Sequence, residues 1–181
     1  MNALGMIEVT SIPKGVEAGD AMLKAAAVEL ITAQSICAGK YIVIVTGEVA
    51  AVEESVEAGK ATAGQKLIDS MVISHVHPQV PKAINACNEI GSVAAIGVME
   101  AFSLCAAVVA ADAAVKAADV DLIDIRLGRG LGGKAFITMT GDVAAVRASV
   151  EAGESRPECA GLMAESVVIP HPHPDMIQAL Y

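Results

Sequence analysis

Apolar residues recur along this chain with two spacings, and the order of the spacings is the same in each half. Short apolar, β-prone runs predict strands, while an alanine-rich run with Val16, Leu23 and Ala26 at helical spacing predicts a helix. The first half therefore predicts the order strand, helix, strand, strand, helix, strand over residues 4–10, 15–27, 29–36, 40–46, 49–58 and 67–74. A further short helix is predicted at residues 81–87, before a linker at residues 88–92.

Three residues predict how the second helix of each half begins or ends. Gly59 and Gly153 lie where a left-handed C-terminal cap is expected, because glycine adopts positive φ without strain. Asp142 precedes the second-half helix, where its carboxylate is expected to cap the first free N–H groups.

The second half of the chain repeats the first. LGMIE at residues 4–8 returns as IGVME at residues 96–100, which is 92 positions later. VAAV at residues 49–52 returns unchanged at residues 143–146, which is an offset of 94. The repeat indicates that one structural unit occurs twice.

The offset between the repeats changes along the chain. It grows by two between Ile31 and Gly39, so this segment is expected to contain a loop that differs between the halves. The tail motif HVHP at residues 75–78 matches HPHP at residues 171–174. We predict one domain over residues 1–90 and a second over residues 91–181.

The predicted order of elements in each repeat, β-α-β-β-α-β, describes a ferredoxin-like split βαβ unit. Such a unit places both helices on one face of an antiparallel sheet, so the predicted fold class is α+β with two tandem ferredoxin-like domains.

Composition excludes several classes of function. The 181 residues carry a net charge of −9, which argues against nucleic-acid binding because phosphates require a basic surface. Hydrophobic residues make up 54% of the chain but aromatic residues only 2%, so the core is expected to consist of small side chains. No apolar run reaches the ~18–20 residues of a membrane span, and the first residues lack the pattern of a signal peptide. We expect a cytoplasmic protein.

Several motifs are similar to those of bacterial microcompartment shell proteins. They are LGMIE at 4–8, AGDAMLKAA at 18–26, GDVAAV at 141–146, VEAG at 150–153 and VIPHPH at 168–173. The similarity extends over nearly the whole chain, once per repeat, and two tandem copies resemble the trimeric class of the family. The resemblance implies two tandem BMC domains with unpermuted strand order, and a pseudohexameric homotrimer. It also implies that the trimer tiles with neighbouring shell proteins into the facet of a microcompartment, a cytoplasmic organelle.

The loop between the second and third predicted strands resembles the propanediol-utilisation type of shell protein. Its sequence is SICAGK at residues 35–40, whereas the second repeat has LGRGLGGK at residues 127–134 and no cysteine. The resemblance implies that this loop lines a central pore and that Cys37 of three subunits binds one [4Fe–4S] cluster per trimer. It further implies electron transfer across the shell, with a redox enzyme or flavoprotein as partner. The implied pore-lining residues are Ser35, Ile36, Ala38 and Gly39.

Symmetry explains how one cysteine per chain could form a metal site. A closed trimer places three copies of an axial residue around one point. A [4Fe–4S] cluster usually has four thiolate ligands, so three would leave one iron open to another ligand. The alternative is that Cys37 is a small apolar residue like most lone cysteines. We expect Cys105 to pack in the core, and Cys87 and Cys159 to be structural or exposed thiols.

Four further residues are candidates for contacts between tiles. Asp20 and Lys24 lie four residues apart on a predicted helix, and the second repeat has the same pair at Asp112 and Lys116. The resemblance places these lysines, and the tail histidines, at the tile edge. The tile-edge candidates are Lys24, Lys116, His75 and His171. The family usually has arginine at the two histidine positions, so this edge could be pH-sensitive. A zinc site formed by the H-x-H motifs is the alternative.

No catalytic constellation is found, so we do not expect an enzyme. Glu8 and Glu100 recur in apolar strands and are interpreted as structural. The glycines of residues 128–133 lack the strand–loop–helix context of a phosphate loop. Three functions are considered: a shell tile with an electron-transfer cluster, a cluster-free pore for small metabolites, and a small-molecule-binding regulator on the same fold.

Overall fold

The structure, a computed structural model, describes residues 3–180 and forms two compact units. Of the described residues, the first unit contains 3–76 together with 128–133, and the second contains 77–127 together with 134–180.

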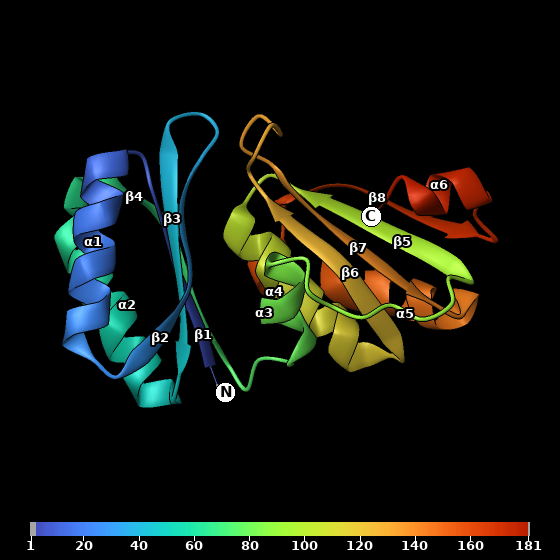
Figure 1. Ribbon diagram of the computed structural model, residues 1–181, viewed down its shortest axis with the longest axis horizontal. Helices are drawn as coiled ribbons and strands as arrows, with labels where there is room; N and C mark the ends of the chain where they lie inside the picture. The colour runs from blue at the N-terminus through green and yellow to red at the C-terminus, as the bar shows by residue number, and fades with distance from the viewer. Residues whose placement is uncertain (1–2, 181) are drawn as a thin grey trace. The chain divides into compact units, whose positions relative to one another are not determined.

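The first unit is a four-stranded antiparallel sheet with two helices on one face (Figure 1). Its strand order is β2-β3-β1-β4, which is the order expected of a ferredoxin-like fold. The elements are β1 (Ala3–Val9), α1 (Ile12–Ala25), β2 (Val28–Ile36), β3 (Lys40–Gly47), α2 (Val49–Ala63), a 3₁₀ turn (Gly64–Lys66) and β4 (Leu67–Ser74).

The second unit repeats this architecture with strand order β6-β7-β5-β8. Its repeated elements are β5 (Ala95–Ala101), α4 (Leu104–Ala117), β6 (Val120–Leu127), β7 (Ala135–Gly141), α5 (Val143–Glu154), a 3₁₀ turn (Pro157–Cys159) and β8 (Met163–Pro170). Two short helices complete it, α3 (Gln79–Ile84) and α6 (Pro174–Gln178). The predicted α+β class and the unpermuted order within each repeat are confirmed.

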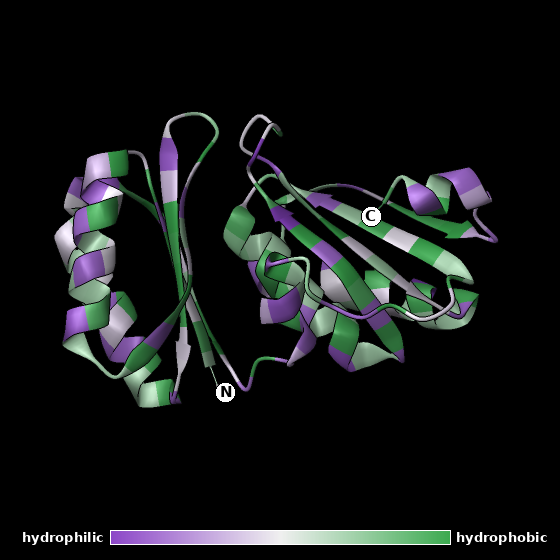
Figure 2. Cartoon of the chain, viewed as in Figure 1, coloured by the Kyte–Doolittle hydropathy of each residue, from purple (hydrophilic) through white to green (hydrophobic). Residues whose placement is uncertain are grey.

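Close contact between helices and sheet explains the small side chains. The core of the first unit is lined by Ala3, Ile7, Ala18, Met22, Val43, Val45, Val52 and Val56. At Gly5 of the central strand, an added Cβ would lie 2.6 Å from side-chain atoms of both Val52 and Val56. In the second unit, a Cβ added at Gly97 would lie 2.7 Å from Cγ1 of Val146. Figure 2 shows the central strands β1 and β5 as largely apolar ribbons.

The predicted glycine caps are wrong. α2 continues past Gly59 to Ala63 and is followed by Gly64 at φ 53°. Gly59 is buried within the helix, where an added Cβ would lie 2.6 Å from Cγ of Met22. Gly153 is likewise inside α5, which ends at Glu154. Both glycines therefore permit helix packing rather than helix termination.

The start of α1 and the cap of α5 also differ from prediction. α1 begins at Ile12 rather than at residue 15, because Ser11 accepts a hydrogen bond from the Lys14 N–H at 3.4 Å and a proline occupies the first turn. Asp142 does lie at the N-cap of α5, but its side chain forms no cap hydrogen bond.

The loop that differs between the repeats lies where the change in offset predicts it. β2 and β3 are joined by residues 37–39, whereas β6 and β7 are joined by the longer segment 128–134. No helix within residues 3–180 is long and apolar enough to cross a membrane.

One buried hydroxyl differs between the repeats. Ser55 of α2 donates a hydrogen bond to the Met22 carbonyl at 3.0 Å, which links the two helices of the first unit. Its repeat equivalent, Ser149 of α5, is also fully buried, but its hydroxyl has no hydrogen-bond partner among the described residues.

We predict that Ser55→Ala lowers the free energy of unfolding by about 1 kcal/mol, since it removes a buried hydrogen bond. Ser149→Ala removes an unsatisfied buried hydroxyl and should be neutral or stabilising. Urea unfolding of the two variants provides the comparison. Equal losses in both would contradict the assignment of the Ser55 hydrogen bond.

Candidate functional site

The tip of the β2–β3 hairpin presents the Cys37 thiol. Ile36 and Lys40 are the last paired residues of the two strands, so Cys37, Ala38 and Gly39 form the turn between them. Gly39 has φ 75°, a conformation that favours glycine. Cys37 is half-buried, while Ala38 and Gly39 are exposed. We call residues 37–39 the Cys37 turn.

A loop from the second repeat holds this turn in place. Residues 128–133, which we call the glycine loop, belong to the same compact unit as the Cys37 turn. The Cys37 N–H donates to the Gly128 carbonyl at 2.9 Å. The Gly130 N–H donates to Sγ of Cys37 at 3.2 Å. Two backbone groups of one loop therefore fix both the backbone and the sulfur of Cys37.

One glycine of the glycine loop lies in tight contact with β2, and all of its glycines adopt positive φ. Gly128 has φ 70°, and an added Cβ would lie 3.0 Å from Cβ of Ile36. Gly133 has φ 89°, and an added Cβ would lie 3.7 Å from the Cys37 carbonyl oxygen. Ile36 is consequently buried against this loop. Gly128 therefore permits both positive φ and a close approach to Ile36, whereas positive φ alone favours glycine at position 133.

An ion pair anchors the strand that follows the turn. Nζ of Lys40 lies 2.8 Å from Oε1 of Glu8, whose side chain is only 2% exposed. Lys134 and Glu100 form the equivalent pair in the second unit at 2.7 Å. The recurrence of both glutamates is thus explained: each holds the lysine that follows the β2–β3 or β6–β7 connection.

The other three cysteines lie in different environments. Cys105 is buried in the first turn of α4, as expected for core packing. Cys159 is also buried, and burial raises the pKa of its thiol, with the nearby Glu158 carboxylate acting in the same direction. Cys87 is exposed and its Sγ lies 3.2 Å from the Asn85 carbonyl oxygen. Cys37 is therefore the one cysteine that lies in a turn held by a glycine-rich loop.

The described part of one chain does not bring together a set of metal ligands. Within residues 3–180, no group of three or more His, Cys, Asp or Glu side chains could hold one. Cys37 nevertheless suits a shared site, because its thiol is partly accessible and is flanked by small residues that allow other copies to approach. Its sulfur already accepts an N–H, which is the kind of hydrogen bond that iron–sulfur ligands receive.

The candidate tile-edge residues lie on exposed surfaces of both units. Lys24 pairs with Asp20 at 2.6 Å, and Lys116 pairs with Asp112. His75 and His171 follow β4 and β8 directly, with φ 56° and φ 49°. Their roles at a tile edge remain predictions, as does the pore-lining role of Ser35, Ile36, Ala38 and Gly39. Ser35, Ala38 and Gly39 are exposed, whereas Ile36 is buried.

Two features of the site were not predicted from the sequence. The partnership of Glu8 with Lys40 could have been inferred, because both residues recur in the second repeat as Glu100 and Lys134. The hydrogen bond from Gly130 to Cys37 had no such signal. It joins residues that are not equivalent in the two repeats.

Comparison with known proteins matches both repeats to one family. The BMC domain matches residues 3–76 and again residues 95–172. The chain is 40% identical to the bacterial microcompartment shell protein PduT of Citrobacter freundii, over 96% of this chain and 95% of that protein. It is 34% identical to the carboxysome assembly protein CcmO of Synechococcus elongatus, over 98% of this chain and 68% of that protein.

Solved structures agree with the fold. A microcompartment protein from Desulfitobacterium hafniense DCB superimposes with a TM-score of 0.93 at 48% identity, covering 98% of this chain and 99% of that chain. A fused permuted hexameric shell protein from the RMM microcompartment gives a TM-score of 0.60 at 24% identity, covering 84% of this chain and 83% of that chain. The second similarity concerns the fold alone.

The Glu8–Lys40 pair leads to a prediction on stability. Lys40→Met leaves the buried Glu8 carboxylate without its cation, so the free energy of unfolding should fall by about 1–3 kcal/mol. Lys60→Met is the matched control, because it removes a lysine from an exposed pair with Glu57 and should cost less than about 1 kcal/mol. Urea unfolding measures both. A loss no larger for Lys40→Met than for the control would show that the buried pair does not anchor β3.

Proposed function

Because the chain belongs to the BMC domain family of bacterial microcompartment shell proteins, we propose that it is a trimeric tile whose three Cys37 thiols share one [4Fe–4S] cluster. Family membership makes the chain a structural component of a microcompartment shell rather than an enzyme. The proposal adds the number of copies, the cluster and electron transfer across the shell. The observation that carries it is the Cys37 turn, whose thiol is partly accessible and accepts an N–H from the glycine loop.

The first unit has an apolar surface that its own sheet does not cover. α1 directs Gly15, Ala18 and Met22 to the core, and these residues are buried. A second stripe, Ile12, Val16 and Leu23, lies beside the first on the helix surface and is 41%, 54% and 40% exposed. An exposed apolar stripe of this kind is typical of a protein–protein interface.

The second unit offers a matching surface. Gly97 of β5 faces the helix α5, so the neighbouring Val98 faces the opposite side of the sheet. On that side a groove of about 330 Å³ is lined by Val98, Glu100, Phe136, Glu165, Ser166 and Val167. Val167 is 46% exposed, so this face can bury further apolar area.

These two surfaces are different, and this determines the kind of assembly. Contact between α1 of one copy and the groove of the next is heterologous, and such contacts form either closed rings or open filaments. Since each chain has two similar units, a ring of three chains has six similar positions. Three chains are the number that the resemblance to the trimeric class implies, and in the proposed pseudohexagonal tile the three Cys37 turns would lie around its axis.

At this axis the three thiols would hold the cluster. A [4Fe–4S] cluster supplies one-electron transfer when bound, and three cysteine ligands leave one iron open to another ligand. The Gly130 N–H donates a hydrogen bond to the sulfur of Cys37, and the small Ala38 and Gly39 would let three turns approach one another. The proposed redox partner is an enzyme or flavoprotein that exchanges electrons with this cluster.

Contacts between tiles are proposed at the edges of the two repeats. Lys24 has a side chain that is 74% exposed, and Lys116 has one that is 40% exposed. His75 and His171 are exposed in the left-handed turns that follow β4 and β8. Equivalent residues from both repeats would give each tile edge a similar set of lysine and histidine side chains.

The proposed subunit interface predicts a response to charge. Val16→Asp places an unpaired carboxylate in the α1 stripe, which should cost about 3 kcal/mol or more per interface, or at least a ~100-fold loss of affinity. We therefore expect trimers for the wild type and monomers for the variant in light scattering coupled to gel filtration. Lys14→Ala changes the net charge equally on the polar side of α1 and should remain trimeric. A trimeric Val16→Asp variant would exclude this interface.

The cluster proposal predicts an iron content. Anaerobically purified protein should contain about four irons and four sulfides per trimer, and Cys37→Ser should lose both together with the electron paramagnetic resonance signal of the reduced cluster. Cys87→Ser, which removes the exposed thiol, is the control and should keep the cluster. Absence of iron from the wild type, even after reconstitution, would refute the cluster and favour a metabolite pore lined by Cys37.

A further inference from the structure

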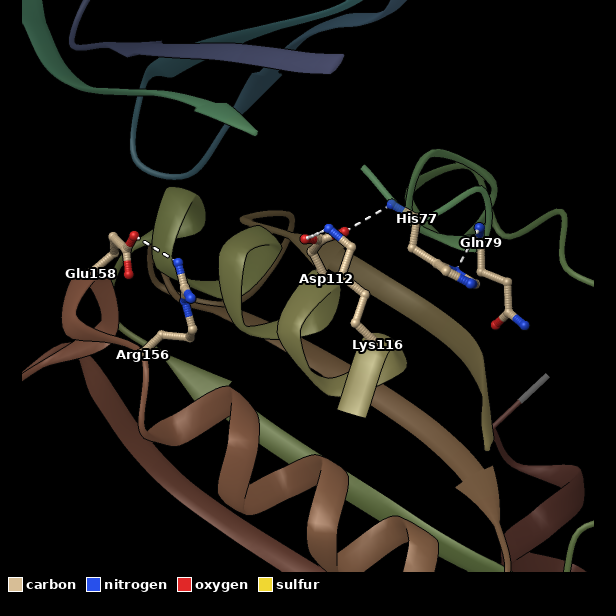
Figure 3. Close-up of polar contacts among 6 residues, drawn as sticks. All are labelled: His77, Gln79, Asp112, Lys116, Arg156 and Glu158. Carbon is tan, nitrogen blue, oxygen red and sulfur yellow. Dashed lines mark hydrogen bonds and ion pairs between the residues drawn. The ribbon is translucent and has the colours of Figure 1, made fainter. Parts of the chain in front are cut away.

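The short helix α3 follows the first repeat but packs on the second unit. The His77 N–H donates to Oδ1 of Asp112 in α4 at 2.8 Å, and Asp112 also pairs with Lys116 (Figure 3). The side chain of Gln79 bonds twice to the edge strand β6. Its Nε2 donates to Oδ1 of Asp121 at 3.0 Å, and its Oε1 accepts the Leu122 N–H at 2.8 Å.

Apolar burial accompanies these hydrogen bonds. Val80 and Ala83 of α3 are fully buried, and Pro81 is buried as well. Lys82 is exposed, so one side of the helix packs and the other faces solvent. α3 therefore closes over the N-terminal part of β6 and the adjoining face of α4.

The second repeat has an equivalent helix that lacks such a surface. α6 follows β8 as α3 follows β4, and a left-handed histidine, His171 or His75, precedes each helix. His173 corresponds to His77, and Met176 corresponds to Val80. No residue of α6 is buried, and Met176 is 57% exposed.

The first unit has the surface that would receive this helix. Asp20, Glu29 and Leu30 lie at the positions equivalent to Asp112, Asp121 and Leu122. Asp20 is paired with Lys24, as Asp112 is paired with Lys116.

The two receiving strands also share their backbone geometry. β2 is an edge strand like β6, and the register shift at Leu30–Thr32 corresponds to the one at Leu122–Asp124. Leu30 is 46% exposed, so an apolar contact is available beside the shift.

We propose that α6 of one copy docks on α1 and β2 of a second copy, repeating the contact that α3 makes within the chain. This inference rests on the proposed trimer and adds a second interface element to it. The His173 N–H would donate to Asp20, Met176 would cover Leu30, and the Asp175 carboxylate would accept the Leu30 N–H. The apolar side of α6, which is exposed within its own chain, would thus be buried on the next subunit.

The sequence also indicates how the two contacts differ. Asp175 replaces Gln79, and Glu29 replaces Asp121. A carboxylate cannot donate the hydrogen bond that the Gln79 amide donates to Asp121. The carboxylates of Asp175 and Glu29 would also lie near each other and repel. The contact of α6 is therefore weaker than that of α3.

Hydrogen exchange of the trimer tests this contact. In the wild type we expect the amides of Leu30 and His173 to exchange slowly, and likewise those of Leu122 and His77, which are hydrogen-bonded within the chain. Met176→Asp should speed exchange at Leu30 and His173 at least ~10-fold, and leave Leu122 and His77 unchanged. Gln178→Asp is the matched control, because the equivalent residue of α3, Lys82, is exposed on the solvent side of the docked helix, and it should change none of the four amides.

The outcomes separate this inference from the proposed function. A trimer in which Leu30 and His173 exchange equally fast in the wild type and in both variants would refute the docking of α6. The proposed trimer would still stand. A wild type that is monomeric at all concentrations would overturn both.

Discussion

The hydrogen bonds between the glycine loop and the Cys37 turn are the interaction on which the proposed function depends. A thiol at a three-residue hairpin tip would otherwise be free to change rotamer. The Gly128 carbonyl fixes the backbone of Cys37, and the Gly130 N–H fixes its sulfur. Because the loop comes from the second repeat and the turn from the first, a single-domain relative of either repeat alone would lack this contact. Fusion of two domains thus positions the thiol.

The same fusion lets two copies of one scaffold present different surfaces. Both repeats keep the buried glycines, the ion pair beside the connecting loop and the aspartate–lysine pair on the first helix. They differ where function is expected: in the cysteine, in the length of the connecting loop and in the helix after the last strand. α3 is buried on the second unit, whereas α6 exposes its apolar side. The features that the two repeats share maintain the fold, and we expect the features in which they differ to determine how copies associate.

Much of the fold could be predicted because the same pattern of apolar positions occurs in both halves of the chain. The order of strands and helices along each repeat followed from periodicity, and the place of the differing loop followed from the offset, whereas several helix ends did not. Gly59 and Gly153 were misinterpreted because a glycine near the end of a helix can either cap the helix or permit a close packing contact. Only the observed packing against Met22 or Met99 distinguishes these two roles. Cys37 was found by resemblance to a family. The Gly130 hydrogen bond was not predictable, since it joins non-equivalent residues 93 apart.

Native mass spectrometry of anaerobically isolated protein tests the central claim most directly, because it counts chains and clusters in the same particle. The account predicts a species of three chains carrying the added mass of one [4Fe–4S] cluster, with no cluster on dissociated single chains. A cluster or metal ion retained by a single chain, or a trimer that stays free of iron and sulfide after reconstitution, would contradict it.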